Sequence, residues 1–300
     1  MTTHRWFDWA LLLSLSLAWG FTFVLISVAL HSFPPMTLVS IRLITGALTL
    51  YIVLRWQGLR LPTGWAWWRR FATLAAVGNI VPFTLISWGE LYISSSLAGI
   101  LMALMPISVM ILAHFFVANE RITPRKATGF ILGLVGVLVL VGTEALTGLG
   151  GINLLAQVAI IAATLCYAVN SIITKRLPTV HVLVAATGTL VAGSLILTPL
   201  ALWVDQPWQN SIQPGAMAAV LVLGVMSTGL ATWVYFLIVA RRGPSFLSMI
   251  NYIIPVVAFG AGVWLLSEPA SVQKFIALGT IFAGIAISQT KRSRKTAPHP

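Results

Sequence analysis

The sequence predicts an all-α membrane protein in which ten transmembrane helices form two inverted repeats of five. Two observations lead to this prediction. First, 58% of the 300 residues are hydrophobic and only 8% are charged, whereas a soluble domain carries about 25% charged residues. Apolar runs of roughly 20 residues, the length that crosses a bilayer, recur along the whole chain. Second, one pattern of residues occurs twice, in the middle of the chain and near its end.

The repeated pattern is built around two glutamates. Glu120 ends an apolar run that contains Pro106, and Glu268 ends one that contains Pro255. The residues at +3, +6 and +16 also correspond, with Thr123, Lys126 and Gly136 after the first glutamate and Ser271, Lys274 and Gly284 after the second. The two glutamates are 148 positions apart, close to half of the chain. We therefore expect a duplicated unit, with one repeat at 1–148 and the other at 149–300.

Short breaks divide the apolar sequence into ten spans. The first follows Arg5 and runs from Trp9 to Leu30, which is too long for the apolar core of a signal peptide, and no small-residue cleavage site follows it. Several later spans nearly abut, so neighbouring helices must form tight antiparallel hairpins. In order, the expected spans are 9–30, 35–54, 71–92, 95–118, 126–142, 152–173, 181–204, 214–240, 244–267 and 271–289.

The positions of the basic residues predict the topology. With both termini in the cytoplasm, 16 of the 18 Lys and Arg residues lie in cytoplasmic segments, as the positive-inside rule requires. Only Lys274 falls outside, and only Arg42 falls within a span. Because five spans per repeat is an odd number, the second repeat must be inverted relative to the first. Inverted repeats are typical of transporters whose central site opens to either face of the membrane.

Several function classes are excluded by what the sequence contains. The net charge of +12 does not indicate nucleic-acid binding, because nearly every basic residue lies at the end of an apolar run. The single cysteine, Cys166, allows no disulfide within the chain and no cysteine-based metal site. Neither a catalytic triad, a GxxxxGK[ST] phosphate loop nor a metal-spaced cluster is present. We therefore expect no enzymatic activity, no cofactor and no ATP-driven pumping.

The repeated segments resemble a known family. The stretch from Leu97 to Gly136, with its mid-helix Pro106 and the pair Asn119–Glu120, resembles the EamA family of the drug/metabolite transporter superfamily. The second copy, with Pro255, Glu268 and Gly284, resembles the same repeat. Ala18-Trp19-Gly20 with Phe23 resembles the start of the family's first helix, and Arg42 resembles the arginine of its second. The second copy departs from the pattern, because it has Tyr167-Ala168 in place of Trp-Gly and no intramembrane arginine.

The resemblance implies a ten-helix carrier whose central cavity is lined mainly by spans 1, 3, 4, 6, 8 and 9. Family members export amino acids and other metabolites, and the bacterial exporters of aromatic and other neutral amino acids are the most similar branch. The expected protein is therefore an exporter in a bacterial-type inner membrane that works by alternating access. Its expected partners are a small-molecule substrate and the lipid bilayer.

Polar and aromatic residues at helical spacing predict where the substrate binds. Polar side chains at bilayer depth are costly, and those that share one helical face can line a cavity. Asn79 and Thr228 are 149 positions apart, so they are equivalent in the two repeats. Packing of helix against helix remains the alternative for each such residue. The expected substrate-binding residues are Asn79, Phe83 and Ser87 in span three, Tyr167 and Asn170 in span six, Thr228 in span eight, and Ser248, Asn251 and Tyr252 in span nine.

Two charges lie within or near the spans. Arg42 lies about 10 Å into span two at 1.5 Å per residue, and Glu90 lies about one turn from the same end of span three. Because an unpaired charge at this depth is expensive, we expect a pair or a shared water-filled site. Snorkelling of Arg42 to the headgroups is the alternative.

The repeated prolines and glutamates have structural interpretations. Pro106 and Pro255 each remove an intrahelical hydrogen bond and should bend their helices. A static kink remains the alternative to a hinge at each site, and the presence of a proline at this place in both repeats favours the hinge. Glu120 and Glu268 are expected to fix the adjoining hairpins, with Thr123 and Ser271 capping the helices that follow.

Two other function classes remain as alternatives. A polyspecific drug carrier or lipid flippase shares the architecture, but a carrier of cationic drugs normally needs a carboxylate at mid-span, and none lies there. A membrane sensor would need a signalling domain or a long cytoplasmic tail, whereas eleven residues follow Gln289.

Overall fold

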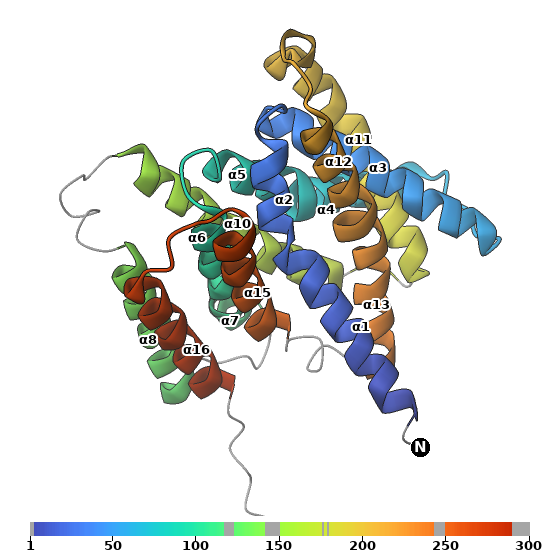
Figure 1. Ribbon diagram of the computed structural model, residues 1–300. Helices are drawn as coiled ribbons and strands as arrows, with labels where there is room; N and C mark the ends of the chain where they lie inside the picture. Colours follow the sequence, from blue (N-terminus) through green and yellow to red (C-terminus); the bar gives the residue numbers. More distant parts are fainter. Residues whose placement is uncertain are drawn as a thin grey trace, which may run out of the picture.

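The computed structural model describes residues 3–116, 123–141, 151–175, 177–178, 180–242 and 250–289. Within these ranges all regular structure is helical and no strand occurs. The helices form one bundle with long, nearly straight rods at its edges (Figure 1). Ser248, Glu120 and the chain beyond Gln289 lie outside the described residues.

In the first half of the chain most expected spans are divided into two shorter helices. The division falls at turns of π or 3₁₀ helix, or at a single turn residue. The elements are α1 (Thr3–Gly20), α2 (Thr22–Ala29), α3 (Pro35–Trp56), α4 (Trp65–Ala75), the π-helical η1 (Ala76–Ile80), α5 (Val81–Gly89), α6 (Ser95–Leu101), the 3₁₀ turn η2 (Met102–Leu104), α7 (Met105–Phe116) and α8 (Pro124–Val141).

The second half holds two uninterrupted helices of 24 residues and a third span that contains a longer π-helical segment. The elements are α10 (Ile152–Lys175), α11 (Val182–Asp205), the 3₁₀ turn η3 (Pro207–Gln209), α12 (Pro214–Val222), the π-helical η4 (Leu223–Leu230), α13 (Ala231–Arg242), α15 (Ile250–Leu265) and α16 (Val272–Gln289).

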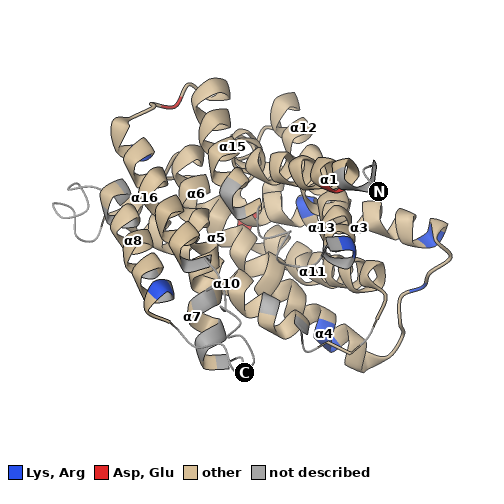
Figure 2. Cartoon of the chain, turned by 90° about the horizontal axis from the view of Figure 1, so that it is seen from below, with Lys and Arg blue, Asp and Glu red and all other residues tan. Residues whose placement is uncertain are grey.

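The helices are long and apolar enough for a membrane protein. Among the described residues, six cross the length criterion of a bilayer: Trp6–Ala29, Pro35–Trp56, Trp65–Gly89, Ile152–Thr174, Val182–Asp205 and Pro214–Tyr235. Shorter apolar helices cover Ser95–Val109, Ala127–Gly136, Ile253–Leu265 and Val272–Ile287. Figure 2 shows how few charged residues the helices carry. The prediction of an all-helical membrane protein is confirmed for this part of the chain, and the arrangement as ten spans in two inverted repeats stays a prediction.

The third span begins earlier than the sequence indicated, at Trp65 rather than residue 71. The first turns of α4 are amphipathic: Arg69 and Arg70 are exposed, while Phe71 is fully buried. The Phe71 ring occupies the space beside Gly188 of α11, where any side chain would collide with it. A helix with one apolar face is stable when that face packs against a neighbouring helix, even where charged residues interrupt the apolar run. For this reason the helix begins earlier in the chain than the apolar run does.

Most helices of the first half pack against helices of the second half. α3 lies along α11, α5 along α10, α6 along α15, and α8 along α16; the last pair forms one edge of the bundle in Figure 1. Large apolar side chains such as Leu195, Trp203 and Phe275 remain exposed on the outside. An apolar outer surface of this kind is suited to contact with lipid. The polar side chains of the candidate site lie where the two halves of the chain meet.

Candidate functional site

Two π-helical turns occur at equivalent positions in the two halves. η1 contains Asn79 and η4 contains Thr228, the pair that is separated by 149 positions. In η1 the following Pro82 has no N–H to donate to the carbonyl of Gly78. In η4 the Thr228 hydroxyl donates to the carbonyl oxygen of Leu223 at 3.0 Å and so enters the backbone ladder. Such turns are rare and frequently mark functional sites.

Arg42 is the centre of a cluster between the halves. Its side chain is 4% exposed. Its Nε donates a hydrogen bond of 2.6 Å to the Thr228 hydroxyl oxygen, and its guanidinium lies 3.9 Å from the centre of the Phe83 ring. α3 can approach η4 this closely because Gly224 faces it: a Cβ there would lie 3.0 Å from the Arg42 carbonyl oxygen. Arg42 therefore joins α3 to η4 and α5. We call Arg42, Phe83, Tyr167 and Thr228 the Arg42 cluster.

Tyr167 and Asn170 reach this region from α10. The rings of Phe83 and Tyr167 are 6.5 Å apart between centroids. Asn170 lies one turn further along and packs against Gly78, where a Cβ would be 2.7 Å from its amide. Its Oδ1 is buried and has no hydrogen-bond partner among the described residues. Asn79 is half-buried in η1.

Glu90 caps the end of α5 and is 8% exposed. Both of its carboxylate oxygens are buried without a hydrogen-bond partner in the part of the chain that the structure describes. The hydroxyl oxygen of Ser87, one turn earlier, is equally buried and unpartnered. Glu90 interacts electrostatically with Arg42 and with Glu268, but it forms no ion pair with a described residue.

The predicted site residues thus fall into three groups. Arg42, Phe83, Tyr167 and Thr228 form the Arg42 cluster; Asn79, Ser87, Glu90 and Asn170 lie on the same helices, within one or two turns of it. For Asn251 and Tyr252 the structure describes the helix, α15, but not the side chains, and Ser248 is outside the described residues. Pro106 is the second residue of α7, directly after the 3₁₀ turn η2, whereas Pro255 lies inside α15.

The structure also brings together residues that the sequence did not single out. The Asp205 carboxylate, at the end of α11, accepts hydrogen bonds from the backbone N–H of Thr37 at 2.6 Å and from its hydroxyl at 2.9 Å. It therefore caps the start of α3, which belongs to the other half of the chain. Thr37 is a residue type that favours helix starts, but its partner is 168 positions away.

Glu268 makes the same kind of contact at the start of α6. Its carboxylate accepts bonds from the Ser95 N–H at 2.8 Å, the Ser95 hydroxyl at 2.7 Å and the Ser96 N–H at 3.0 Å. Partial burial raises the pKa of the Glu268 carboxyl, but the hydrogen bonds from Ser96 and Ser95 lower it more, so that this pKa lies below its ordinary value. Ser271 does cap α16, through the Lys274 N–H at 3.3 Å. The side chain of Glu268 therefore binds the first half of the chain, whereas its backbone N–H donates to the carbonyl oxygen of Gly262 in its own hairpin at 3.2 Å.

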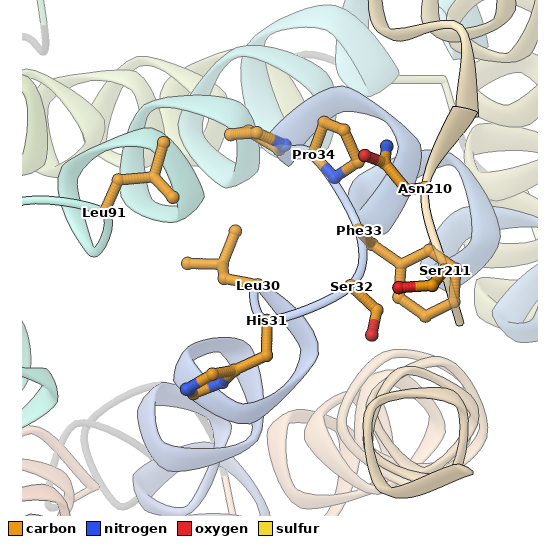
Figure 3. A pocket seen from close by; sticks show the side chains of 9 residues that line it. Leu30, His31, Ser32, Phe33, Pro34, Leu91, Asn210 and Ser211 are labelled. Carbon is orange, nitrogen blue, oxygen red and sulfur yellow. The ribbon is translucent and has the colours of Figure 1, made fainter. Parts of the chain in front are cut away.

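The two caps lie at one end of the bundle, which we call the capped end. There α2, α5, α11 and α15 end and α3, α6 and α12 begin. A hollow of about 330 Å³ opens at this end between the α2–α3 turn, Leu91, Asn210 and Ser211 (Figure 3). At the opposite end, Arg241 of α13 binds Asp8 of α1 through Nε and Oδ1 at 2.8 Å. Both ends therefore carry polar contacts between the halves.

Comparisons with known proteins agree with this architecture. Residues 7–142 and again 154–290 match the EamA-like transporter family. An uncharacterized transporter of Archaeoglobus fulgidus is 30% identical over 91% of this chain and 95% of its own length. The uncharacterized transporter YoaV of Bacillus subtilis is 24% identical over 95% of this chain and 97% of its own length. One solved crystal structure, 22% identical, has a TM-score of 0.67 and covers 93% of this chain and 95% of its own, a likeness of fold alone.

Proposed function

Because the chain belongs to the EamA-like transporter family, we propose that it exports neutral or aromatic amino acids across a bacterial-type plasma membrane. Membership supports a membrane transporter over an enzyme, and its partners are then a small-molecule substrate and membrane lipid. The proposal goes further in naming the substrate and the direction. It rests above all on the Arg42 cluster, to which α3 and α5 of the first half and α10 and η4 of the second half contribute.

We propose that the architecture consists of ten spans in two inverted repeats, 1–148 and 149–300, with both termini in the cytoplasm. The two separate matches to one family support a duplication. The paired π-helical turns η1 and η4 support it too, because rare irregularities at equivalent positions are what a duplicated unit would retain. The positive-inside rule then makes the capped end the outer end.

The proposed alternating access depends on contacts between the two halves that can break at one end of the bundle and form again. At the capped end, Asp205 and Glu268 hold the starts of α3 and α6. Opening this end requires those hydrogen bonds to break while the two halves tilt about the centre. Pro106 and Pro255 provide the bends at which α7 and α15 can adjust, because neither proline can donate a backbone hydrogen bond. No step of this cycle needs ATP.

The substrate follows from the chemistry of the residues proposed to bind it. Asn79, Asn170, Thr228 and Ser87 offer amides and hydroxyls, and the rings of Phe83 and Tyr167 offer an apolar surface. Ser248, Asn251 and Tyr252 would complete the site from span nine. A small amino acid with an apolar side chain suits both kinds of group, since ligand sites combine an apolar lining with a few polar contacts.

The test is exchange of radiolabelled amino acids in proteoliposomes that contain the full-length protein. We expect labelled neutral and aromatic amino acids to enter proteoliposomes that have been loaded with the same unlabelled amino acid. Phe83→Ala and Tyr167→Ala should reduce it several-fold, because they remove the rings of the Arg42 cluster. Trp203→Ala removes a ring that is 77% exposed on α11 and should leave it unchanged. Absence of exchange for every amino acid would refute the substrate assignment.

A second candidate, export of cationic drugs, is favoured by one observation. Glu90 is a buried carboxyl group whose oxygens have no partner among the described residues, the kind of group that attracts a ligand cation. The same proteoliposomes separate the two candidates when they are given a quaternary ammonium dye in place of the amino acid.

A further inference from the structure

Arg42 and Glu90 are two buried ionisable groups, and neither forms an ion pair with a described residue. Arg42 is bound by the hydroxyl of Thr228 and by the face of the Phe83 ring, and neither carries a full negative charge. Glu90 accepts no hydrogen bond from any described residue. At bilayer depth such charges are expensive and usually pair with each other. The two groups influence each other electrostatically and form no direct ion pair.

The contact between α5 and α10 holds further buried polar groups without partners among the described residues. The hydroxyls of Thr84 and Ser87 lie on α5, six and three residues before Glu90, and neither hydroxyl oxygen has a partner among the described residues. On the facing helix α10, Gln157 Oε1 and Asn170 Oδ1 are buried in the same condition. Buried polar groups without partners cost free energy and call for a water, an ion or a ligand. Their concentration along α5 and α10 indicates that something polar binds here.

We infer that Arg42 and Glu90 are the two ends of a slot for a zwitterionic head group, an inference that rests on the proposed function. The ligand's carboxylate binds the Arg42 guanidinium, and its ammonium binds the Glu90 carboxylate. Thr228 binds the Nε of Arg42, and no described residue is hydrogen-bonded to the two Nη groups. They can therefore hold a planar carboxylate, a geometry that a guanidinium matches well. The Phe83 and Tyr167 rings stand beside the guanidinium and receive the ligand's side chain.

The slot selects by charge as well as by shape. A zwitterion neutralises both buried charges at once. A cation can neutralise only Glu90 and an anion only Arg42, and each would leave the other charge buried and unpaired, which is a strong basis for rejection. Glu268, the further carboxylate that interacts with Glu90, is already held by Ser95 and Ser96 and does not compete for the ammonium.

The test measures binding to the purified full-length protein in detergent, apart from transport. The probes are phenylalanine, its carboxamide, which is a cation, and N-acetylphenylalanine, which is an anion. We expect the wild-type protein to bind the zwitterion at least tenfold more tightly than either blocked form. Arg42→Gln should abolish the preference for phenylalanine over the carboxamide, and Glu90→Gln the preference over the N-acetyl form. Arg42→Lys keeps the charge and should retain part of the preference for a carboxylate.

Two controls separate charge recognition from structural damage. Arg55→Gln removes an exposed arginine from the same helix, α3, and should leave all three affinities unchanged. Glu268→Gln breaks a cap and should shift the three affinities by one common factor, through the conformational equilibrium. Thermal unfolding identifies any variant that fails to fold. If Arg42→Gln fails to fold, the affinities of Arg42→Lys for the three probes test the role of Arg42 instead.

The outcomes distinguish the slot from the proposed function. If phenylalanine is bound and exchanged, but Arg42→Gln and Glu90→Gln weaken all three probes equally, the slot is wrong and the function stands. If amino acids are not exchanged, but a non-amino-acid zwitterion such as glycine betaine binds and loses affinity in both variants, the slot stands and the function is wrong. Binding of the carboxamide or the N-acetyl form as tightly as phenylalanine to the wild-type protein overturns the slot outright.

Discussion

At the scale of single residues, Glu268 shows how a charge is kept between two halves of an apolar bundle. Its carboxylate lies where α6 begins, and unpaired N–H groups and the helix dipole favour a negative charge there. Ser95 contributes its hydroxyl as well. Because these bonds are made to the ionised form, they lower the pKa of Glu268 despite its partial burial, which acts in the opposite direction.

Glu268→Gln should therefore lower the stability of the protein in a manner that depends on pH. A group whose pKa is lowered by folding stabilises the folded state above its unfolded pKa, 4.5 for a glutamate, and loses that contribution as the pH falls through the lower folded value. We expect a loss of about 1 kcal/mol at pH 7, near the low end for charged hydrogen bonds because the carboxylate is only half-buried.

Thermal unfolding of wild type and variant between pH 7 and pH 4 measures this effect. The difference in Tm should be constant down to about pH 4.5 and shrink below it. Ser271→Ala, which removes the uncharged cap of α16, should lower Tm by an amount that does not change over this range. If the difference in Tm between wild type and Glu268→Gln increased toward acid pH, the lowered pKa assigned to Glu268 would be contradicted.

At the scale of elements, glycines decide how closely helices of the two halves approach. α8 and α16 pack along their length, and a Cβ on Gly284 of α16 would lie 2.5 Å from the Gly129 carbonyl oxygen and 2.9 Å from the Gly133 backbone nitrogen. Gly284 is the glycine at +16 in the second copy of the repeated sequence pattern. Close contact of this kind is how helices associate in lipid, where apolar side chains gain little from leaving it.

Gly284→Ala should separate these helices and destabilise the protein by about 1–3 kcal/mol, as overpacking generally does. Gly279 provides a matched control on the same helix, because a Cβ there would meet no atom within 4 Å. Gly279→Ala should leave stability unchanged or raise it by up to about 1 kcal/mol, since alanine favours helix. Thermal unfolding in one detergent compares the two, and equal effects would show that the close contact is not what stabilises the pair.

At the scale of the whole molecule, the polar contacts between the halves are concentrated at its two ends and its centre. Asp205 and Glu268 act at the capped end, Arg42 with Thr228 at the centre, and Asp8 with Arg241 at the opposite end. Each of these contacts joins residues more than 160 positions apart. A transporter that alternates between two states needs contacts of this kind, which break without exposing new apolar surface to water.

The orientation in the membrane is the prediction that belongs to this scale. Reporter fusions at residues 60 and 293 should give cytoplasmic signals, and a fusion at residue 207 should give an external one, because 16 of the 18 basic residues then lie inside. Residue 207 follows Asp205 at the capped end. A cytoplasmic signal at residue 207 would contradict both the inverted repeats and the assignment of the capped end as the outer end.

Part of the site could be predicted because it depends on local patterns. The spacing of Asn79, Phe83 and Ser87 along one helix, and the offset between Asn79 and Thr228, are properties of the sequence. The bond between Arg42 and Thr228 is not, since it depends on η4 widening by one residue and on Gly224 admitting α3. The two caps were missed for a similar reason: Thr37 and Ser95 are ordinary helix-start residues, and their acidic partners come from the other half.

The sequence by itself determined the class of the protein, because hydropathy and the positions of charged residues depend only on which side chains the bilayer tolerates. It also predicted the duplication, which is a comparison of the chain with itself. Only the tertiary structure decided which polar groups meet, because hydrogen bonds and ion pairs act over about 3–4 Å between helices distant in sequence. Which polar groups remain without a partner depends on that same geometry, and for this reason the unpartnered oxygens of Glu90 among the described residues could be found only in the folded chain.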